Sequence, residues 1–281
     1  MNDKEAVTSV VAIGANAQMC LEKIQAFMTI EEPDVVDCDE IFKRGLKISQ
    51  FNFISTNADL KKSIIKEIIK DIPVCFLIVD AGDRSSLKYA RLFGDYIRTL
   101  PCGLSVALLF GSHNNILLSK EFTTELYSNI DVIIELDTLA SDETSKVIAA
   151  YNIIRGINST LTKPLLCGFD LASLHSHLKS SGLLQVAYAI ESNEPDNSYD
   201  KKVFMATQLA LERIKKRITV EDTRRVFIFI EGSEHGLSVM SLNDPIMMIN
   251  NTFPKSIIEW VGSISKTIGN EVRVLIGATN M

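Results

Sequence analysis

The sequence contains no apolar run that approaches the ~18 residues of a membrane-spanning helix. Its start, MNDKEAVTSV, is polar and of mixed charge, so it also lacks the apolar segment of a signal peptide. We therefore expect a cytoplasmic protein that does not insert into a membrane directly.

Cysteine pairs and excess positive charge are absent as well. The cysteines are Cys20, Cys38, Cys75, Cys102 and Cys167, and they form no C-x-x-C pair. Their odd number provides no disulfide framework, so reduced and mostly buried thiols are expected. The net charge is −6 with a pI near 5.4. This balance excludes a general nucleic-acid binder, because such a protein presents a basic face.

The sequence also lacks the common signatures of metal and nucleophile chemistry. His175 and His177 are two residues apart, which places them about 200° apart on a helix, whereas a helical zinc pair is spaced i, i+4. There is no G-x-S-x-G elbow and no complete Walker A motif. We expect no metal site, and a small-molecule enzyme is the least supported of the function classes considered.

What is present is a regular alternation of strands and helices. Apolar strands are expected at 7–13, 51–55, 74–80, 104–110 and 131–136. Helical spacing of apolar residues predicts helices at 17–28, 60–69, 86–99 and 117–128. This alternation predicts an α/β domain built on a doubly wound parallel sheet.

The pattern changes after a long helix expected at 142–161. Beyond it we expect helices near 171–180 and 200–216, and strands at 183–190, 226–231, 237–242, 256–263 and 271–279. That order is typical of an α+β domain with a mostly β second half. The predicted organisation is therefore a nucleotide-type domain at 1–141, a central helix at 142–163 and a smaller domain at 164–281.

The end of the chain resembles a known family. GNEVRVLIGAT at 269–279 closely resembles the last strand of FtsZ, which reads G-D-E-V-R-V-x-x-I-A-T. Weaker matches follow in the same order along the chain: Ser55–Asp59 to V-N-T-D, Ile134–Asp137 to I-P-N-D, and Gly168–Ser173 to N-x-D-x-A-D. With the matching order of elements, the chain resembles a divergent FtsZ-like protein of the tubulin/FtsZ superfamily. The resemblance implies the two-domain tubulin/FtsZ fold.

The resemblance also implies a nucleotide site, and here the family pattern is eroded. The G-G-G-T-G-T-G loop is replaced by Asp80–Leu87, which keeps one glycine. The residues that could still hold GTP or GDP, with Mg²⁺ only alongside the nucleotide, are Gly14, Asn16, Asn57, Gly82 and Ser85. The competing interpretation is an Asp-capped turn that opens a helix after Asp80, and a helix N-cap turn at Gly14–Asn16.

The catalytic loop of the family is also only partly matched in this sequence. Its first aspartate corresponds to Asp170, but its second acidic position is Ser173. A neutral hydroxyl cannot order cations or water as a carboxylate does, so we expect no active GTPase. A structural alternative for Asp170 is capping the helix that starts near Leu171.

These expectations define a function hypothesis and its alternative. The hypothesis is a hydrolysis-deficient FtsZ-like protein that acts in cytoskeletal assembly, scaffolding or regulation of cell division, through contacts with itself, head to tail, or with an FtsZ-like paralogue. The alternative is a GTP-hydrolysing, filament-forming protein with altered phosphate loops. The sequence ends after the strand at 271–279, so membrane tethering through the family's terminal peptide is not expected.

Overall fold

The computed structural model describes residues 8–31, 48–55, 62–69, 72–111, 126, 128–166, 170–179, 181–192, 198–266 and 268–280. The helix expected at 117–128 lies almost wholly outside these residues. Contacts divide the chain into two compact units: Met1–Tyr151 with Leu171–Leu183, and Asn152–Asp170 with Leu184–Met281. The three-part division at 141 and 163 stays a prediction.

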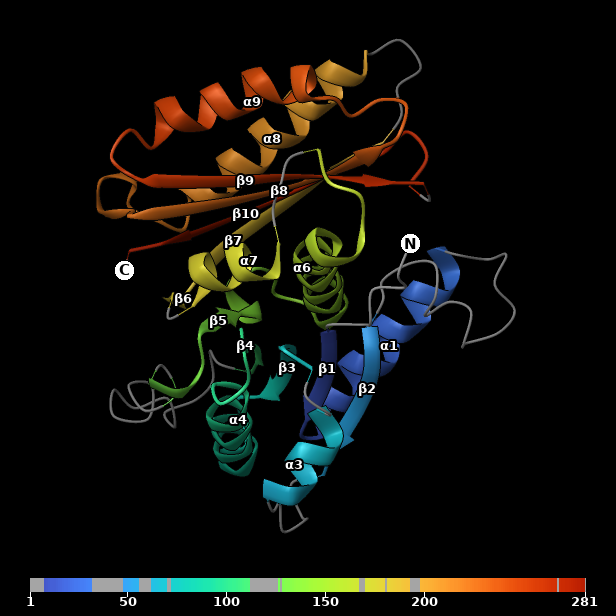
Figure 1. The fold of residues 1–281 in the computed structure, drawn as a ribbon, viewed down its shortest axis with the longest axis vertical. Helices are drawn as coiled ribbons and strands as arrows, with labels where there is room; N and C mark the ends of the chain where they lie inside the picture. Colours follow the sequence, from blue (N-terminus) through green and yellow to red (C-terminus); the bar gives the residue numbers. More distant parts are fainter. Residues whose placement is uncertain are drawn as a thin grey trace. The chain divides into compact units, whose positions relative to one another are not determined.

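The first unit is built on a six-stranded sheet in which every neighbouring pair is parallel (Figure 1). Its strands are β1 (Thr8–Ile13), β2 (Ile48–Ile54), β3 (Val74–Asp80), β4 (Leu104–Phe110), β5 (Val132–Glu135) and β6 (Gly182–Leu183). The order across the sheet is β2-β1-β3-β4-β5-β6. The predicted parallel sheet is therefore confirmed, with β1 and β3 side by side.

Helices join the strands of this sheet, because parallel neighbours need crossover connections. The helices of this part of the chain are α1 (Ala15–Glu31), α3 (Lys62–Ile69), α4 (Arg84–Ile97), η1 (Leu136–Thr138), α7 (Leu171–Leu178) and the beginning of α6 (Glu143–Thr162). α3 and α4 share one apolar core with alternate residues of β1 and β3. This core includes Val11 and Ile13 of β1, Leu77 of β3 and Phe93 of α4. Strands β1, β3 and β4 are buried along their whole length, which explains their continuous apolar sequences.

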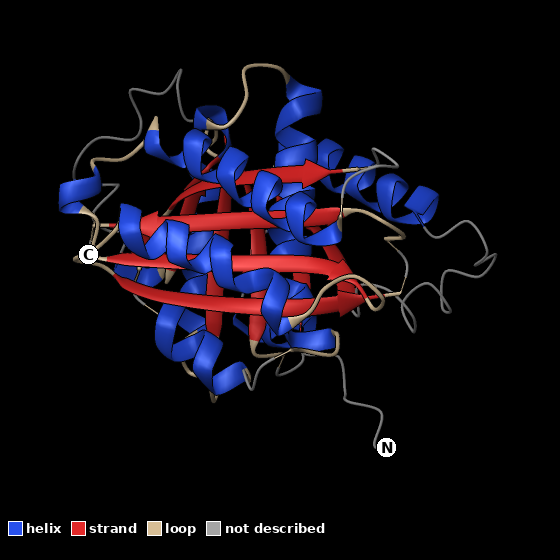
Figure 2. Cartoon of the chain, turned by 90° about the horizontal axis from the view of Figure 1, so that it is seen from above, coloured by secondary structure: helices blue, strands red, loops and turns tan. Residues whose placement is uncertain are grey.

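The second unit has a four-stranded sheet of order β7-β10-β8-β9. The strands are β7 (Gln185–Glu191), β8 (Arg225–Ser233), β9 (Ile257–Ser265) and β10 (Val272–Thr279). β10 is antiparallel to β7 and β8, whereas β8 and β9 are parallel. Two helices, α8 (Tyr199–Lys215) and α9 (Val239–Thr252), pack on one face of this sheet (Figure 2). A short η2 (Val220–Asp222) precedes β8.

The strand expected at 237–242 is wrong, because these residues begin helix α9. Ser238 and Ser241 form a capping box that starts the helix. The buried positions Leu242, Pro245 and Ile249 then recur at helical spacing. A short apolar run does not distinguish a strand from the first turn of a buried helix, and the parallel pairing of β8 and β9 requires a crossover element here.

The strand expected at 183–190 is divided between the two sheets. Gly182 and Leu183 pair with β5, whereas Gln185 begins β7 in the second sheet. Gly182 has a φ of 63°, a left-handed conformation that favours glycine at this change of direction. Sequence periodicity cannot show such a division, because both short strands are equally apolar.

Candidate functional site

The carboxyl ends of β1 and β3 form the candidate site of the first unit. The chain leaves β1 towards β2 and leaves β3 towards β4, in opposite directions across the sheet. Open α/β sheets bind ligands at such a topological switch point, outside the carboxyl ends of the strands. Four of the residues predicted to hold nucleotide lie at this point: Gly14 and Gly82 in the two turns, and Asn16 and Ser85 in the first turns of the helices that follow.

Gly14 follows β1 in a conformation that suits glycine alone. Its φ is 95°, and its N–H donates to the carbonyl of Ile54 at the end of β2 (3.3 Å). A Cβ at this position would lie 2.4 Å from Ser86 Oγ and 2.8 Å from the Cβ of Asp80. Gly14 therefore permits the loop after β1 to approach the loop after β3.

Asp80 is the centre of the site, and only 7% of it is exposed. Its Oδ2 accepts a hydrogen bond from the Asn16 amide (2.8 Å), and its Oδ1 accepts one from the backbone N–H of Gly82 (3.0 Å). Gly111, which follows β4 with a φ of 76°, adjoins this carboxylate and the Gly82 amide. Sequence reasoning did not identify Gly111; its place after a predicted strand was the available signal.

Asp83 caps helix α4 with its own carboxylate. Its side chain accepts from the backbone N–H of Ser85 (3.0 Å), the backbone N–H of Ser86 (3.3 Å) and the Ser86 hydroxyl (2.8 Å). The structure thus has the Asp-capped turn that the sequence offered as the alternative interpretation. The amide of Ser85, a predicted nucleotide ligand, is occupied by a side chain of the same loop.

Two acidic residues near the start of α6 interact with residues of that helix. Asp142 accepts a hydrogen bond from the backbone N–H of Ser145 (2.8 Å), and hydrogen bonds from Ser145 lower the pKa of Asp142. Asp137, within the segment that resembles I-P-N-D, forms an ion pair with Lys146 of α6. Asn57, the remaining predicted nucleotide residue, lies outside the described residues.

The predicted catalytic residues flank the start of α7. Asp170 is exposed and directly precedes this helix, and Ser173 is half-buried in its first turn. Gly168 and Cys167 lie outside the described residues. The roles of Asp170 and Ser173 stay predictions.

The segment that leads from α6 towards Asp170 is held against the second sheet. The carbonyl of Pro164 accepts from the N–H of Ile264 (2.8 Å), and the N–H of Leu166 donates to the carbonyl of Gly262 (2.9 Å). Both partners belong to β9, so residues 164–166 extend along its edge. The start of this connection therefore has a defined position within the second unit.

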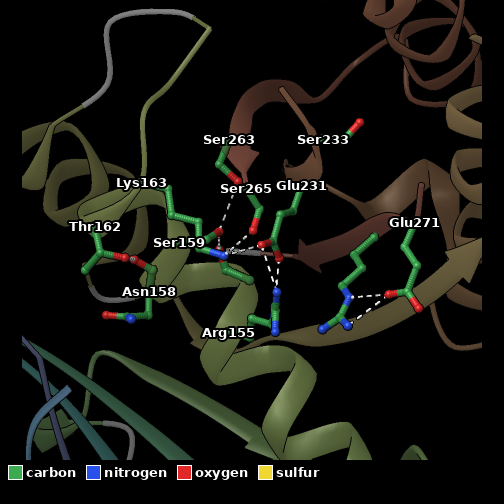
Figure 3. Close-up of polar contacts among 12 residues, drawn as sticks. Arg155, Asn158, Ser159, Thr162, Lys163, Glu231, Ser233, Ser263, Ser265 and Glu271 are labelled. Atoms are coloured by element: carbon green, nitrogen blue, oxygen red, sulfur yellow. Dashed lines mark hydrogen bonds and ion pairs between the residues drawn. The ribbon is translucent and has the colours of Figure 1, made fainter. Parts of the chain in front are cut away.

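A buried ionic cluster anchors the end of α6 in the same unit (Figure 3). The carboxylate of Glu231 on β8 accepts two hydrogen bonds from Arg155 (2.9 and 3.1 Å) and is also paired with Lys163. Lys163 donates a further hydrogen bond to Ser265 (3.0 Å). Sequence reasoning missed this cluster, although a charged residue within an apolar strand or helix face indicates a buried pair.

The charges in this cluster set the protonation state of Glu231. Burial alone raises the pKa of this carboxyl, but the charges and hydrogen bonds of Lys163 and Arg155 outweigh burial and lower it to about 2. Burial lowers the pKa of Lys163, against the attraction of Glu231. Because Arg155 stays charged at all relevant pH values, Glu231 is held as a carboxylate.

We expect acid to weaken the second unit through Glu231. A lowered carboxyl pKa contributes stability above the ordinary value of 4.5, and that stability is lost as the pH falls towards about 2. The full contribution is about 3 kcal/mol. Urea unfolding measured between pH 6 and 2.5 should show this loss in the native protein. A Glu231→Gln variant should show a flatter pH dependence, and an equally steep one would contradict the assignment.

Other candidate groups add no reactive centre within the described chain. Cys20 and Cys75 are buried, which raises the pKa of both thiols, to about 12 for Cys20. Among the described residues, no three His, Cys, Asp or Glu side chains are grouped to hold a metal ion. No helix in the described ranges is both long and apolar enough to span a membrane.

Comparisons with known proteins give a clear result for the fold. No protein-family model and no curated protein matches the sequence. An empty FtsZ dimer from M. jannaschii matches with a TM-score of 0.68 and 14% identity, over 96% of this chain and 88% of that one. A single-substitution variant of the same FtsZ matches with a TM-score of 0.70 and 15% identity, over 98% and 91%.

A third solved structure extends the likeness to another branch. CetZ2 from Haloferax volcanii, as a GTPγS-bound protofilament, matches with a TM-score of 0.58 and 12% identity, over 96% of this chain and 92% of that one. The predicted resemblance and the fold class, a parallel α/β sheet with a second, mixed-sheet domain, are thereby confirmed. The chain has the two-domain fold of the tubulin/FtsZ superfamily.

Proposed function

We propose that this chain is an FtsZ-like protein that does not hydrolyse GTP and acts through protein–protein contacts. Its roles would be cytoskeletal assembly, scaffolding or regulation of cell division in the cytoplasm. The observation that carries this proposal is the pair of carboxylates at the carboxyl end of β3: Asp80 is its last residue, and Asp83 lies in the turn that follows. No nucleic acid partner is expected, given the net charge of −6.

The two carboxylates occupy the donors that a phosphate would need. Phosphate binding at a helix N-terminus relies on backbone N–H groups and on positive helix-end charge. Here the N–H groups of Ser85 and Ser86 donate to Asp83, and that of Gly82 donates to Asp80. A carboxylate about 4–5 Å from a phosphate oxygen would add roughly 4 kcal/mol of repulsion at an effective dielectric of ~20.

The proposed loss of hydrolysis has separate support in Ser173. Its hydroxyl stands where the family motif has its second aspartate, and hydrolysis needs a positioned water with charge stabilisation. Asp170 supplies a single exposed carboxylate beside it in sequence. We infer that this pair does not activate water for attack on a γ-phosphate.

Self-association is the contact we favour for the proposed role. One similar structure is an FtsZ dimer, and another is a CetZ2 protofilament. A head-to-tail contact propagates without nucleotide if the two surfaces are complementary. Binding to an FtsZ-like paralogue is the second arrangement that fits this proposal.

The alternative function is a GTP-binding, filament-forming protein. Its support is that the CetZ2 structure contains GTPγS and that Asn16 and Gly82 are exposed at the switch point of the sheet. Mg²⁺ bound with the nucleotide could offset part of the charge of Asp80 and Asp83. Under this alternative, the loop would have to exchange its internal hydrogen bonds for phosphate contacts.

A turnover assay separates the two functions. Phosphate release from GTP should be indistinguishable from background at high protein concentration. Denaturing the purified protein should release no GDP or GTP that chromatography can detect. Robust turnover that Asp170→Ala abolishes would establish the alternative.

A neutralised cap tests whether the carboxylate prevents binding. Asparagine caps a helix about as well as aspartate, so Asp83→Asn removes the charge and retains the turn. We expect this variant to bind a fluorescent GTP analogue at least tenfold more tightly than the native chain. Asp95→Asn, an exposed substitution on the same helix, is the matched control and should leave affinity unchanged. Tight binding by the native chain would contradict the proposal.

A further inference from the structure

The first turns of α8 and α9 border a groove of mixed polar and apolar lining that the described chain leaves open. The two helices lie side by side on the second sheet (Figure 1), and the groove between them measures about 350 Å³. Its lining includes Asp200, Lys201, Phe204, Met240, Asp244 and Pro245. This volume falls at the lower end of the range, about 300–1,000 Å³, typical of binding pockets.

Large apolar side chains are exposed on both helices that border the groove. Met240 is 83% exposed and Met247, two turns along the same helix face, is 54% exposed. Phe204 and Met205 of α8 and Val239 of α9 are also exposed, and Phe204 lines the groove together with Met240. Large apolar side chains exposed at a groove favour an interaction site, and methionine adapts its shape to a partner.

The small number of exposed apolar side chains favours a single segment over a second copy of the chain. Five such side chains lie on the two adjacent helices, against the roughly 20–30 residues that a standard interface uses on each side. A standard interface between two folded proteins buries about 800 Å² on each side. An amphipathic helix needs only one row of side chains in a groove of this kind.

The charges at the rim indicate the sign of the partner. Asp200 and Asp244 are exposed, and within the described chain neither has an ion-pair partner within 4.0 Å. Helix α9 contains no lysine or arginine, and Lys201 is the single cation among the described residues that line the groove. Two carboxylates against one ammonium favour a partner segment with net positive charge.

From these observations we propose that the α8–α9 groove binds a net-basic amphipathic helix of a partner protein. The apolar face of that helix packs on Phe204 and Met240. Its lysine or arginine side chains flank this face and pair with Asp200 and Asp244. The site belongs to the second unit and does not depend on the nucleotide question.

The test uses the whole chain and a defined probe. The probe is a fluorescein-labelled amphipathic peptide of leucine and lysine, about 18 residues long or five helical turns. The comparison peptides are its glutamate counterpart and a scrambled peptide of the same composition. In fluorescence anisotropy, the basic peptide should bind at least tenfold more tightly than either.

Paired variants localise the binding. The double variant Phe204→Ser/Met240→Ser should bind the basic peptide at least tenfold more weakly than the native chain. The double variant Asp200→Asn/Asp244→Asn should lose most of the difference in affinity between the basic and the glutamate peptide. Ile257→Ser, an exposed substitution at the start of β9, is the control and should change nothing. Circular dichroism confirms that each variant is folded.

Several results would overturn the proposal. These are no binding of the basic peptide at about 100 μM, equal binding of the scrambled or glutamate peptide, or binding that survives the Phe204 and Met240 changes. Sedimentation supplies a further outcome. A concentration-dependent dimer that the same changes abolish would identify a second copy as the occupant instead.

Discussion

Glu231→Ala should lower the free energy of unfolding of the second unit by about 3–5 kcal/mol. The substitution leaves Arg155 buried, only 4% exposed, without the carboxylate that accepts its two hydrogen bonds. It also leaves Lys163, largely buried, without the same partner. Because two buried cations lose the carboxylate that they share, this is the largest single-site effect that we expect in the molecule.

The measurement can be confined to the correct unit. The chain contains one tryptophan, Trp260, which lies in β9 and packs against the core of the second sheet. Urea unfolding followed by its fluorescence therefore reports on the unit that contains Glu231. Far-UV circular dichroism of the same samples reports on both units.

A matched control isolates burial from charge. Glu234 is half-exposed and lies 3.8 Å from Lys266, so Glu234→Ala should change stability by less than about 0.5 kcal/mol. Replacing Arg155, Lys163 and Glu231 together by apolar residues should cost much less than Glu231→Ala alone. Equal effects of Glu231→Ala and Glu234→Ala would show that the buried cluster contributes nothing.

Gly14→Ala should destabilise the first unit by about 3 kcal/mol. The added methyl would lie 2.4 Å from Ser86 Oγ and 2.8 Å from the Cβ of Asp80, and the φ of 95° is unfavourable for alanine. Crowding in a packed site costs about 1–3 kcal/mol, and a left-handed conformation adds roughly 1–2 kcal/mol. The effect should appear in circular dichroism and much less in Trp260 fluorescence, because Gly14 lies in the first unit.

Two variants separate crowding from backbone strain. Gly269 also has a positive φ, 56°, but a Cβ there meets nothing within 4 Å, so Gly269→Ala should cost about 1 kcal/mol. Ser86→Ala removes the nearest atom, so adding it to Gly14→Ala should recover part of the loss. If Gly14→Ala lowers the free energy of unfolding no more than Gly269→Ala does, the two loops are not packed closely enough at Gly14 to exclude a methyl group.

The sequence predicted most of the first sheet because its strands carry their own signal. Strands buried on both faces have continuous apolar sequences, and 74–80 and 104–110 match β3 and β4 residue for residue. The Asp-capped turn after Asp80 was also open to prediction, because Asp83 bonds to residues two and three positions along the chain. A short sequence pattern can predict a turn of this kind because its hydrogen-bond partners are close in sequence.

The remaining features depend on partners that are distant in sequence. Asn16 and Asp80 are 64 positions apart, and Arg155 and Glu231 are 76 positions apart. Residues 237–242 have the apolar content of a strand, and the crossover between β8 and β9 makes them a helix. The α8–α9 groove exists because two helices separated by a strand pack in parallel on one sheet face.

By itself, therefore, the sequence determined the fold class, the two sheet regions and the loops that border the candidate site. Tertiary structure alone decided that Asp80 and Asp83 satisfy the amides of their own loop, that Glu231 has two buried cations, and that Phe204 and Met240 face solvent together. The physical reason is that hydrogen bonding and burial depend on distance in space, whereas periodicity records only which face of an element is apolar.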